Sequence, residues 1–190
     1  ILSVAKHFPG HGDTAEDSHY TLPAVHHDRA RLDSVELLPF KRYIYDGYAG
    51  VMTGHLYVPA LDKARNKPVS MSRAVVTDLL QKELGFRGLC FTDALAMKGA
   101  TTRKSDNPSV MALLAGNDIL LAPTAPINDF AAVKEALEEG ILDREEIEAK
   151  IIKILQYKYI AGLNDYRPVE TKGLSERLNS PHAAWLAAKL

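Results

Sequence analysis

The chain has 190 residues, of which 46% are hydrophobic and 25% are charged, as is typical of a folded globular protein. This composition excludes a disordered chain, a collagen-like chain and a coiled-coil rod. Lys and Arg number 23 against 24 Asp and Glu, so no basic excess points to a nucleic-acid partner or an anionic membrane surface.

Four short runs along the chain are almost continuously apolar. They are residues 2–8, 49–56, 88–92 and 118–122. This pattern is typical of strands that are covered on both faces, as in parallel sheets. Each run is followed by a polar or Gly/Pro-containing stretch and then by a segment with helical spacing.

The segments after the runs predict helices. We expect them over residues 30–45, 73–84, 108–116, 129–139 and 144–160. Ser72 is the expected N-cap of the second helix, Asn128 or Asp129 of the fourth and Asp143 of the fifth. The fifth helix carries an apolar stripe that we expect to face a core, formed by Ile147, Ile151, Ile154, Leu155 and Tyr159.

Strands that alternate with helices predict a parallel sheet with helices outside it. The two main architectures of this kind are an open doubly wound sheet and a (β/α)₈ barrel, which needs about 250 residues. Four βα units would form half of a barrel. Residues 162–180 are polar and indicate a linker, after which Ser180 is expected to cap a helix from Pro181. Both ends of the chain look like the interior of an element, so we expect a fragment of a longer protein.

Cys90 is the single cysteine, which excludes an intrachain disulfide and a cysteine-rich zinc site. It lies in an apolar run, so we expect a small buried hydrophobic side chain. No stretch approaches the roughly 20 consecutive apolar residues of a membrane span.

Ionisable residues follow three of the expected strands, where the carboxyl ends of a parallel sheet place working residues. Asp93 directly follows the third run and could be a nucleophile, a base or a metal ligand, or the N-cap of a helix. Lys6 and His7 end the first run, and Lys6 suits either a substrate hydroxyl or a salt bridge. His55 follows the second run, as a ligand contact or as a hydrogen-bonded core histidine. Met97 could pack in the core or line a pocket.

Five of the seven histidines lie between residues 7 and 27, and three interpretations of this segment stay open. One is a metal site built from His7, His11, His19 and nearby acids. Another is a phosphate-binding loop around Gly10 and Gly12, although the full glycine-rich motif is absent. The third is an acid–base pair in which Asp17 orients His19, because side chains two residues apart in an extended loop point the same way; a plain structural contact between the two stays open beside it.

The run KHFPGHGDT at residues 6–14, followed by DSH at 17–19, resembles the signature of glycoside hydrolase family 3. It looks most like the β-N-acetylglucosaminidase (NagZ-type) branch of that family. Matching segments follow in order at residues 38–40, 51–55, 59–62, 85–88, 92–98 and 116–118. The resemblance covers about residues 1–165.

This resemblance implies the C-terminal half of a TIM-type (β/α)₈ barrel, with four βα units and parallel strands over residues 1–163. Residues 164–190 would be a linker and the start of a following C-terminal element. The partner of this half would be the remaining half of the same polypeptide, which holds other sugar-binding groups. We therefore expect the isolated 190-residue piece to have little or no hydrolase activity.

The resemblance also implies a retaining mechanism through a covalent glycosyl-enzyme. Asp93 would be the nucleophile, and His19 the acid/base with Asp17 as its dyad partner. Lys6 and His7 would contact the N-acetylglucosamine ring. We add His55 and Met97 as candidate substrate-binding residues. No metal or other cofactor is expected.

The implied activity is that of an exo-acting β-N-acetylglucosaminidase, with peptidoglycan-derived muropeptides as substrate. Two alternatives remain, which are a glycoside phosphorylase on the same scaffold and a non-catalytic carbohydrate-binding module. The sequence does not decide between the cytoplasm and the periplasm of a bacterium.

Overall fold

The structure is a computed structural model that describes residues 2–65, 67–100 and 106–189. The expected features that involve Ile1 and Leu190 therefore lie outside the described residues. The chain divides into two compact units, Ile1–Tyr157 and Lys158–Leu190, which are described separately.

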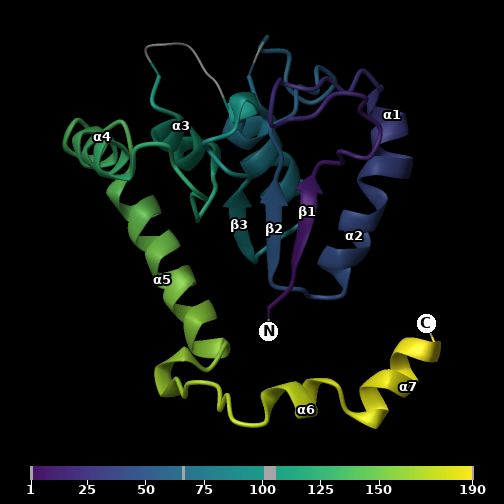
Figure 1. Ribbon diagram of the computed structural model, residues 1–190. Coiled ribbons are helices and arrows are strands. Elements are labelled where there is room, and N and C mark those ends of the chain that lie inside the picture. The colour runs from purple at the N-terminus through teal and green to yellow at the C-terminus, as the bar shows by residue number, and fades with distance from the viewer. Residues whose placement is uncertain (1, 66, 101–105, 190) are drawn as a thin grey trace. The chain divides into compact units, whose positions relative to one another are not determined.

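The first unit is built on a parallel sheet of three strands in the order β1-β2-β3 (Figure 1). These strands are β1 (Val4–Phe8), β2 (Gly50–Thr53) and β3 (Leu89–Thr92), and they confirm the first three predicted strands. Val4 is paired with Gly50, and Gly50 with Leu89. A Cβ atom on Gly50 would lie only 2.8 Å from Val4 Cγ2, so a larger residue at this central position would displace the Val4 side chain.

The fourth predicted strand does not form. In residues 118–122 only Ile119 makes a parallel bridge, to Phe91 of β3. The ladder stops because the next amide, that of Leu121, donates to the Thr92 side-chain Oγ1 at 2.9 Å. Ala122 then adopts a positive φ of 42°, which ends the extended backbone. The run still lies along β3, but without the regular pairing of a strand.

The predicted helices of the first unit are present, with some changes of boundary and type. The first splits into α1 (Arg29–Arg31), the π-helical η1 (Leu32–Glu36) and α2 (Leu38–Tyr45). The second is the π-helical η3 (Ala74–Glu83). The others are α3 (Pro108–Ala115), α4 (Pro126–Glu138) and α5 (Arg144–Ile160). Two 3₁₀ turns, η2 (Val69–Met71) and η4 (Lys98–Ala100), join them.

Of the three helix caps expected in the first unit, one is confirmed and two are wrong. Asp143 Oδ1 accepts from the amide of Glu146 at 2.8 Å at the start of α5, as expected. The Ser72 hydroxyl donates to Asp62 Oδ2 instead, and no side chain caps η3. Helix α4 begins at Pro126, because proline fits the first helical turn, so Asp129 lies inside that turn.

The core lies between the sheet and the helices that follow each strand. The strand residues Phe8, Val51 and Cys90 are fully buried. They belong to one hydrophobic cluster with helix residues that include Leu32 and Leu80. Burial raises the pKa of the Cys90 thiol to about 11, which confirms it as a small buried hydrophobic side chain.

The apolar stripe of α5 does not face a core within the described residues. Ile151 is 51% exposed and Leu155 is 57% exposed. Helix α5 is held by charge instead, because Lys153 Nζ lies 2.9 Å from the buried carboxylate of Asp118. Asp118 Oδ2 also accepts from the amide of Cys90 at 2.8 Å, which ties this helix to β3.

The second unit contains η5 (Leu163–Asp165), α6 (Leu174–Leu178) and α7 (Pro181–Lys189). Residues 162–180 are therefore less irregular than the expected linker, since they include η5 and α6. Ser180 Oγ accepts from the amide of Ala183 at 3.2 Å, which confirms the predicted cap of α7. Across the described ranges, no helix is both long and apolar enough to cross a membrane.

We predict that Asp118→Ala lowers the free energy of unfolding by about 3 kcal/mol, because it leaves Lys153 and the Cys90 amide without their buried partner. Urea denaturation of the full-length protein measures this. The control is Asp78→Ala, which removes an exposed pair with Lys82 and should cost at most about 0.5 kcal/mol. Equal losses from both variants would contradict a structural role for the buried pair.

Candidate active site

The carboxyl ends of the three strands bring the candidate residues to one edge of the sheet, where the arrowheads lie in Figure 1. His7 lies near the end of β1, His55 follows β2 and Asp93 follows β3. The pairing of β2 with β3 continues one step beyond the ladder, since the amide of Asp93 donates to the Thr53 carbonyl at 2.9 Å. The position of Asp93 is thus fixed by the sheet itself.

The Asp93 carboxylate is held by the main chain and turned toward His7. Its Oδ1 accepts from the amide of Ala94 at 2.8 Å, and its Oδ2 lies 3.4 Å from His7 Nε2. The side chain is 13% exposed, so it is shielded but still open to a ligand. Asp93 caps no helix in the described part of the chain, so it remains a candidate nucleophile, base or metal ligand.

His7 is half-buried beside Asp93, and burial lowers its pKa below the ordinary value. The positive charge of Lys6 acts in the same direction, whereas the Asp93 carboxylate opposes it. His7 is therefore neutral at pH 7 and can donate or accept one hydrogen bond. Lys6 is exposed and forms no ion pair with any described residue, so the salt bridge considered for it is not observed.

Asp17 and His19 form the pair that their spacing predicts. His19 Nδ1 lies 2.7 Å from Asp17 Oδ1, and the His19 amide donates to the same oxygen at 2.9 Å. These hydrogen bonds hold the pKa of Asp17 below its ordinary value. A carboxylate in this position fixes the ring and leaves Nε2 as the working atom.

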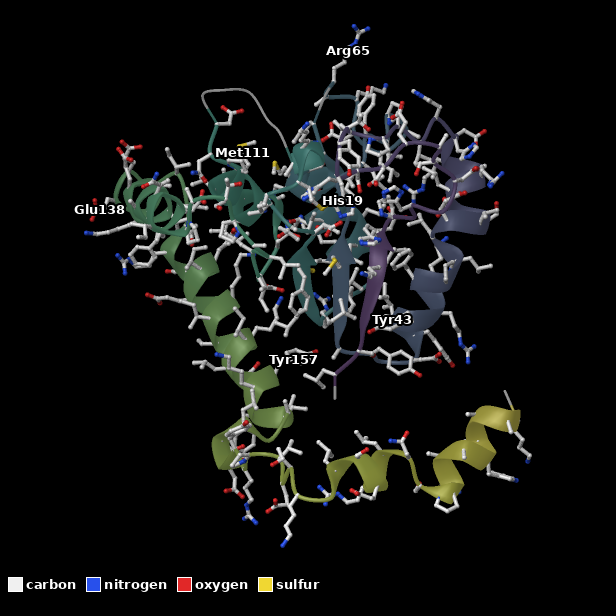
Figure 2. All side chains as sticks on the ribbon, viewed as in Figure 1. His19, Tyr43, Arg65, Met111, Glu138 and Tyr157 are labelled. Atoms are coloured by element: carbon white, nitrogen blue, oxygen red, sulfur yellow. The ribbon has the colours of Figure 1, made fainter. Side chains whose placement is uncertain are left out.

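The pair is exposed, with 69% of the His19 side chain accessible. Figure 2 shows His19 at the same end of the sheet as the strand tips. When His19 is protonated, its positive charge also acts to lower the pKa of His7. Within the described residues, no hydrogen bond or ion pair joins His19 to Asp93.

The segment of residues 9–27, here called the dyad loop, is anchored through Ser18. This buried residue accepts from the amide of Gly99 through its carbonyl at 3.2 Å. Its hydroxyl lies 3.1 Å from His11 Nε2, and His11 Nδ1 lies 2.7 Å from Thr14 Oγ1. Both nitrogens of His11 are therefore used inside the loop.

The structure does not support a metal site of His7, His11 and His19 in this segment, nor a phosphate-binding loop around Gly10. His7, His11 and His19 do not converge on one point in the described part of the chain. The one cluster there with metal-binding spacing consists of Asp13, His27 and Glu36. The Gly10 amide donates to the His7 carbonyl at 2.8 Å, so it is not available to a phosphate group.

His55 is fully buried, as a hydrogen-bonded core histidine would be. Its Nδ1 lies 2.7 Å from Ser70 Oγ and its Nε2 lies 3.1 Å from the Ala94 carbonyl. Burial lowers the pKa of His55, so the ring stays neutral and supports the residue that follows Asp93. Met97 is half-buried in the turn after Asp93.

Asn117 is a positioning residue that the sequence did not predict, because it precedes the fourth apolar run instead of following a strand. It is fully buried, and its Nδ2 donates to the carbonyls of Ser70 and Ala112 at 2.7 and 2.9 Å. Its Oδ1 accepts from Thr53 Oγ1 at 2.9 Å. It thus ties the end of β2 to η2 and α3. The sequence signal that could have identified Asn117 is its place in residues 116–118, one of the segments that match the family.

A cavity of about 730 Å³ lies between β1 and the helices that follow it. Lys6 and His7 line one wall, and Asp13, Arg31 and Glu36 line another. This volume is within the range of small-molecule sites. Asp93, Asp17 and His19 are not among its lining residues, so the cavity lies beside the candidate reacting groups.

Known proteins are similar to this chain in sequence and fold. A model of the glycosyl hydrolase family 3 N-terminal domain matches residues 1–157. The chain is 36% identical over 178 residues to beta-hexosaminidase A of Pseudoalteromonas piscicida, covering 83% of this chain and 30% of that protein.

Solved structures agree with this match. A family 3 beta-N-acetylglucosaminidase from Paenibacillus sp. str. FPU-7 superposes with a TM-score of 0.89 at 34% identity, covering all of this chain and 36% of that one. NagZ from Neisseria gonorrhoeae, solved with N-trifluoroacetyl-D-glucosamine, gives a TM-score of 0.67 at 26% identity over all of this chain and 50% of that one. The chain thus spans between about a third and a half of the length of these relatives.

We predict that acid weakens the fold through His55. Its pKa is lower in the folded than in the unfolded state, so the unfolded chain binds more protons below about pH 6.5. The free energy of unfolding should fall as the pH drops from 6.5 toward the lowered pKa. Urea titrations at pH 7.5 and 5.5 measure this for the wild type and for His55→Gln.

The His55→Gln variant should show a flatter pH dependence, because glutamine does not titrate. The control is His26→Gln, which changes an exposed side chain and should keep the wild-type dependence. An unchanged slope in His55→Gln would exclude His55 as the source.

Proposed function

Because the chain belongs to glycosyl hydrolase family 3, we propose that its full-length form is a retaining exo-β-N-acetylglucosaminidase. The observation that carries this proposal is the Asp93 carboxylate at the tip of β3, 3.4 Å from His7 and on the same edge as the Asp17–His19 pair. The names of the relatives, beta-hexosaminidase and beta-N-acetylglucosaminidase, support the sugar class. The substrate is a terminal β-linked N-acetylglucosamine, as in peptidoglycan-derived muropeptides.

In the first step, Asp93 attacks the anomeric carbon while the bond to the leaving oxygen breaks. Protonated His19 gives its Nε2 proton to that oxygen, so the aglycone departs as an alcohol. The product is a glycosyl ester on Asp93 and a neutral His19. Asp17, which accepts from His19 Nδ1, stabilises the cationic ring before the transfer.

In the second step, neutral His19 takes a proton from water, and the water oxygen attacks the anomeric carbon. The ester bond breaks and Asp93 leaves as a carboxylate, which restores the starting state. Retaining glycosidases ordinarily use two carboxyl groups about 5–5.5 Å apart. A histidine replaces the second carboxyl group here, so that separation does not apply.

Lys6 and His7 are the proposed contacts to the sugar ring, since His7 Nε2 lies 3.4 Å from Asp93 Oδ2 and Lys6 precedes it at the end of β1. For His55 we propose an indirect role, because it is fully buried and its Nε2 lies 3.1 Å from the Ala94 carbonyl. Met97, which is half-buried in the turn after Asp93, stays a proposed substrate contact. Residues 1–163 would be the second half of the barrel and residues 164–190 the start of a following element. The remaining half of the polypeptide would complete the substrate site.

The nucleophile is tested by trapping. Full-length protein treated with a 2-deoxy-2-fluoro-glycosyl fluoride should carry one sugar on the peptide that contains Asp93, as read by mass spectrometry. Asp93→Ala should lose at least about 10³-fold in kcat/KM and take up no label. The matched control is Asp78→Ala, an exposed aspartate on η3 that should keep wild-type activity. Label on another residue would contradict the assignment.

A turnover assay on the wild-type full-length protein separates hydrolysis from phosphorolysis. Adding inorganic phosphate should leave the product as free sugar. Accumulation of a sugar 1-phosphate would instead identify a glycoside phosphorylase.

The acid/base is tested with leaving groups of different acidity. His19→Ala should lower kcat/KM by about 10²–10⁴ for a disaccharide, because its leaving oxygen needs a proton. The loss in kcat/KM should be much smaller for a 2,4-dinitrophenyl glycoside, whose leaving group departs unprotonated. His26→Ala serves as the control. Equal losses for both substrates would exclude His19 as the general acid.

A further inference from the structure

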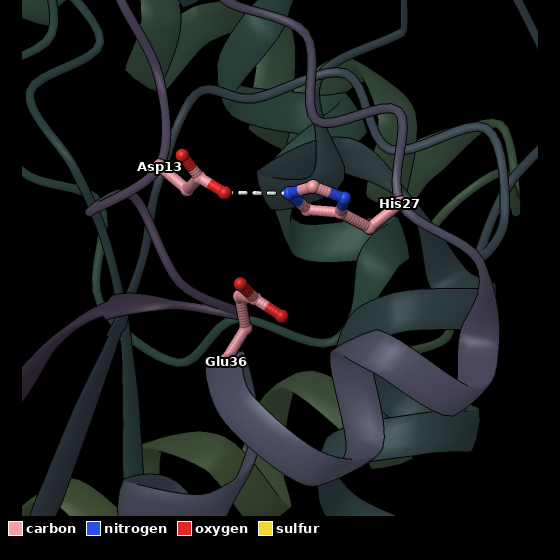
Figure 3. A group of neighbouring side chains, drawn as sticks. All are labelled: Asp13, His27 and Glu36. Carbon is pink, nitrogen blue, oxygen red and sulfur yellow. Dashed lines mark hydrogen bonds and ion pairs between the residues drawn. The ribbon is translucent and has the colours of Figure 1, made fainter.

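Asp13, His27 and Glu36 form a cluster that the proposed mechanism does not use. One ligand atom from each lies within 4.8 Å of the other two. Asp13 and His27 come from near the two ends of the dyad loop, and Glu36 comes from the end of η1. Figure 3 shows the Glu36 carboxylate facing the Asp13–His27 pair.

Glu36 supplies the observation that points to a ligand. Its side chain is only 6% exposed, and its Oε2 has no hydrogen-bond partner among the described residues. Burying a carboxylate oxygen without a partner is costly, so such an atom calls for a cation or a donor. Gly10 packs on Glu36 so closely that a Cβ atom there would lie 2.7 Å from Glu36 Cβ, which limits movement of the side chain.

The charged groups around the cluster have a net negative charge, which favours a divalent cation. Arg31 Nη2 lies 3.1 Å from Glu36 Oε1 and 3.4 Å from Asp13 Oδ2. One guanidinium thus faces two carboxylates, and a net negative charge remains when His27 is neutral. Arg31 engages the other oxygen of Glu36, so Oε2 is still available.

We propose that Asp13, His27 and Glu36 bind a divalent transition-metal ion, with Zn²⁺ as the best fit, and that this ion clamps the ends of the dyad loop. One imidazole and two carboxylates suit zinc, whereas Mg²⁺ and Ca²⁺ prefer all-oxygen sites. Water would fill the fourth position. The ion takes no part in the glycosyl transfer proposed above.

Small movements would form the site. His27 Nε2 and Asp13 Oδ2 are 2.6 Å apart and are joined by a hydrogen bond. Tetrahedral zinc with bonds of about 2.0–2.2 Å needs its donors about 3.3 Å apart. The pair must therefore open slightly, with the His27 proton on Nδ1 so that Nε2 can bind the ion, and both side chains must move toward Glu36, which Gly10 holds in place. Asp13 and His27 are partly exposed and can move.

Equilibrium dialysis of the full-length protein against ZnCl₂, with metal analysis, tests the proposal. We expect one Zn²⁺ per molecule, and none with MgCl₂ or CaCl₂ at the same concentration. His27→Ala and Glu36→Gln should each weaken zinc binding at least about tenfold. Arg31→Ala should strengthen it, because a competing cation is removed.

Two matched controls complete the design. His26→Ala changes the exposed neighbour of His27 and should keep the site. His19→Ala should also keep it, which separates this cluster from the Asp17–His19 pair. If circular dichroism shows that Glu36→Gln does not fold, the zinc binding of His27→Ala decides, because the His27 side chain is partly exposed and its removal should not unfold the protein.

Zinc should also slow hydrogen exchange in residues 9–27 of the wild type but not of His27→Ala. Stoichiometric zinc in His27→Ala, or its loss in His19→Ala, would overturn the proposal. If zinc leaves hydrogen exchange in residues 9–27 of the wild type unchanged, the ion does not hold the ends of the dyad loop. None of these readouts depends on glycosidase activity, so they remain valid even if the proposed function is wrong.

Discussion

Parallel pairing of β1, β2 and β3 is the constraint on which the rest of the structure depends. It brings His7, His55 and Asp93 to one edge although they are separated by more than 35 residues along the chain. The hydrogen bond from the Asp93 amide to the Thr53 carbonyl extends this pairing to the reacting carboxylate. A nucleophile built in this way needs little reorganisation, because the sheet has already fixed its backbone.

A second layer of buried polar groups keeps that edge in register. His55 links Ser70 to the carbonyl of Ala94, and Asn117 links the end of β2 to η2 and α3. Each of these side chains is buried with its hydrogen bonds satisfied, which is the condition under which buried polar groups support a structure. The proposed chemistry therefore combines a rigid carboxylate with an exposed Asp17–His19 pair on a loop.

The sequence predicted those features that depend on a single local pattern, such as an apolar run or the spacing of two residues. Continuous apolar runs predicted β1, β2 and β3, and the spacing of Asp17 and His19 predicted their contact. Prediction failed where a side chain replaced a backbone partner. Thr92 Oγ1 takes the amide of Leu121 and ends the fourth strand, and Asp62 takes the hydroxyl of Ser72 in place of a helix cap. The cluster of Asp13, His27 and Glu36 also depends on tertiary contacts that no spacing rule reports.

The proposed mechanism is tested most directly by a crystal structure of the full-length protein trapped with a 2-deoxy-2-fluoro sugar. The proposed mechanism predicts a bond between the anomeric carbon and an Asp93 carboxylate oxygen. It also predicts that His19 Nε2 lies about 2.6–3.2 Å from the water or leaving oxygen, with Asp17 still bound to Nδ1. A sugar bonded to another residue, or a His19 ring that remains out of reach of the anomeric centre, would contradict it.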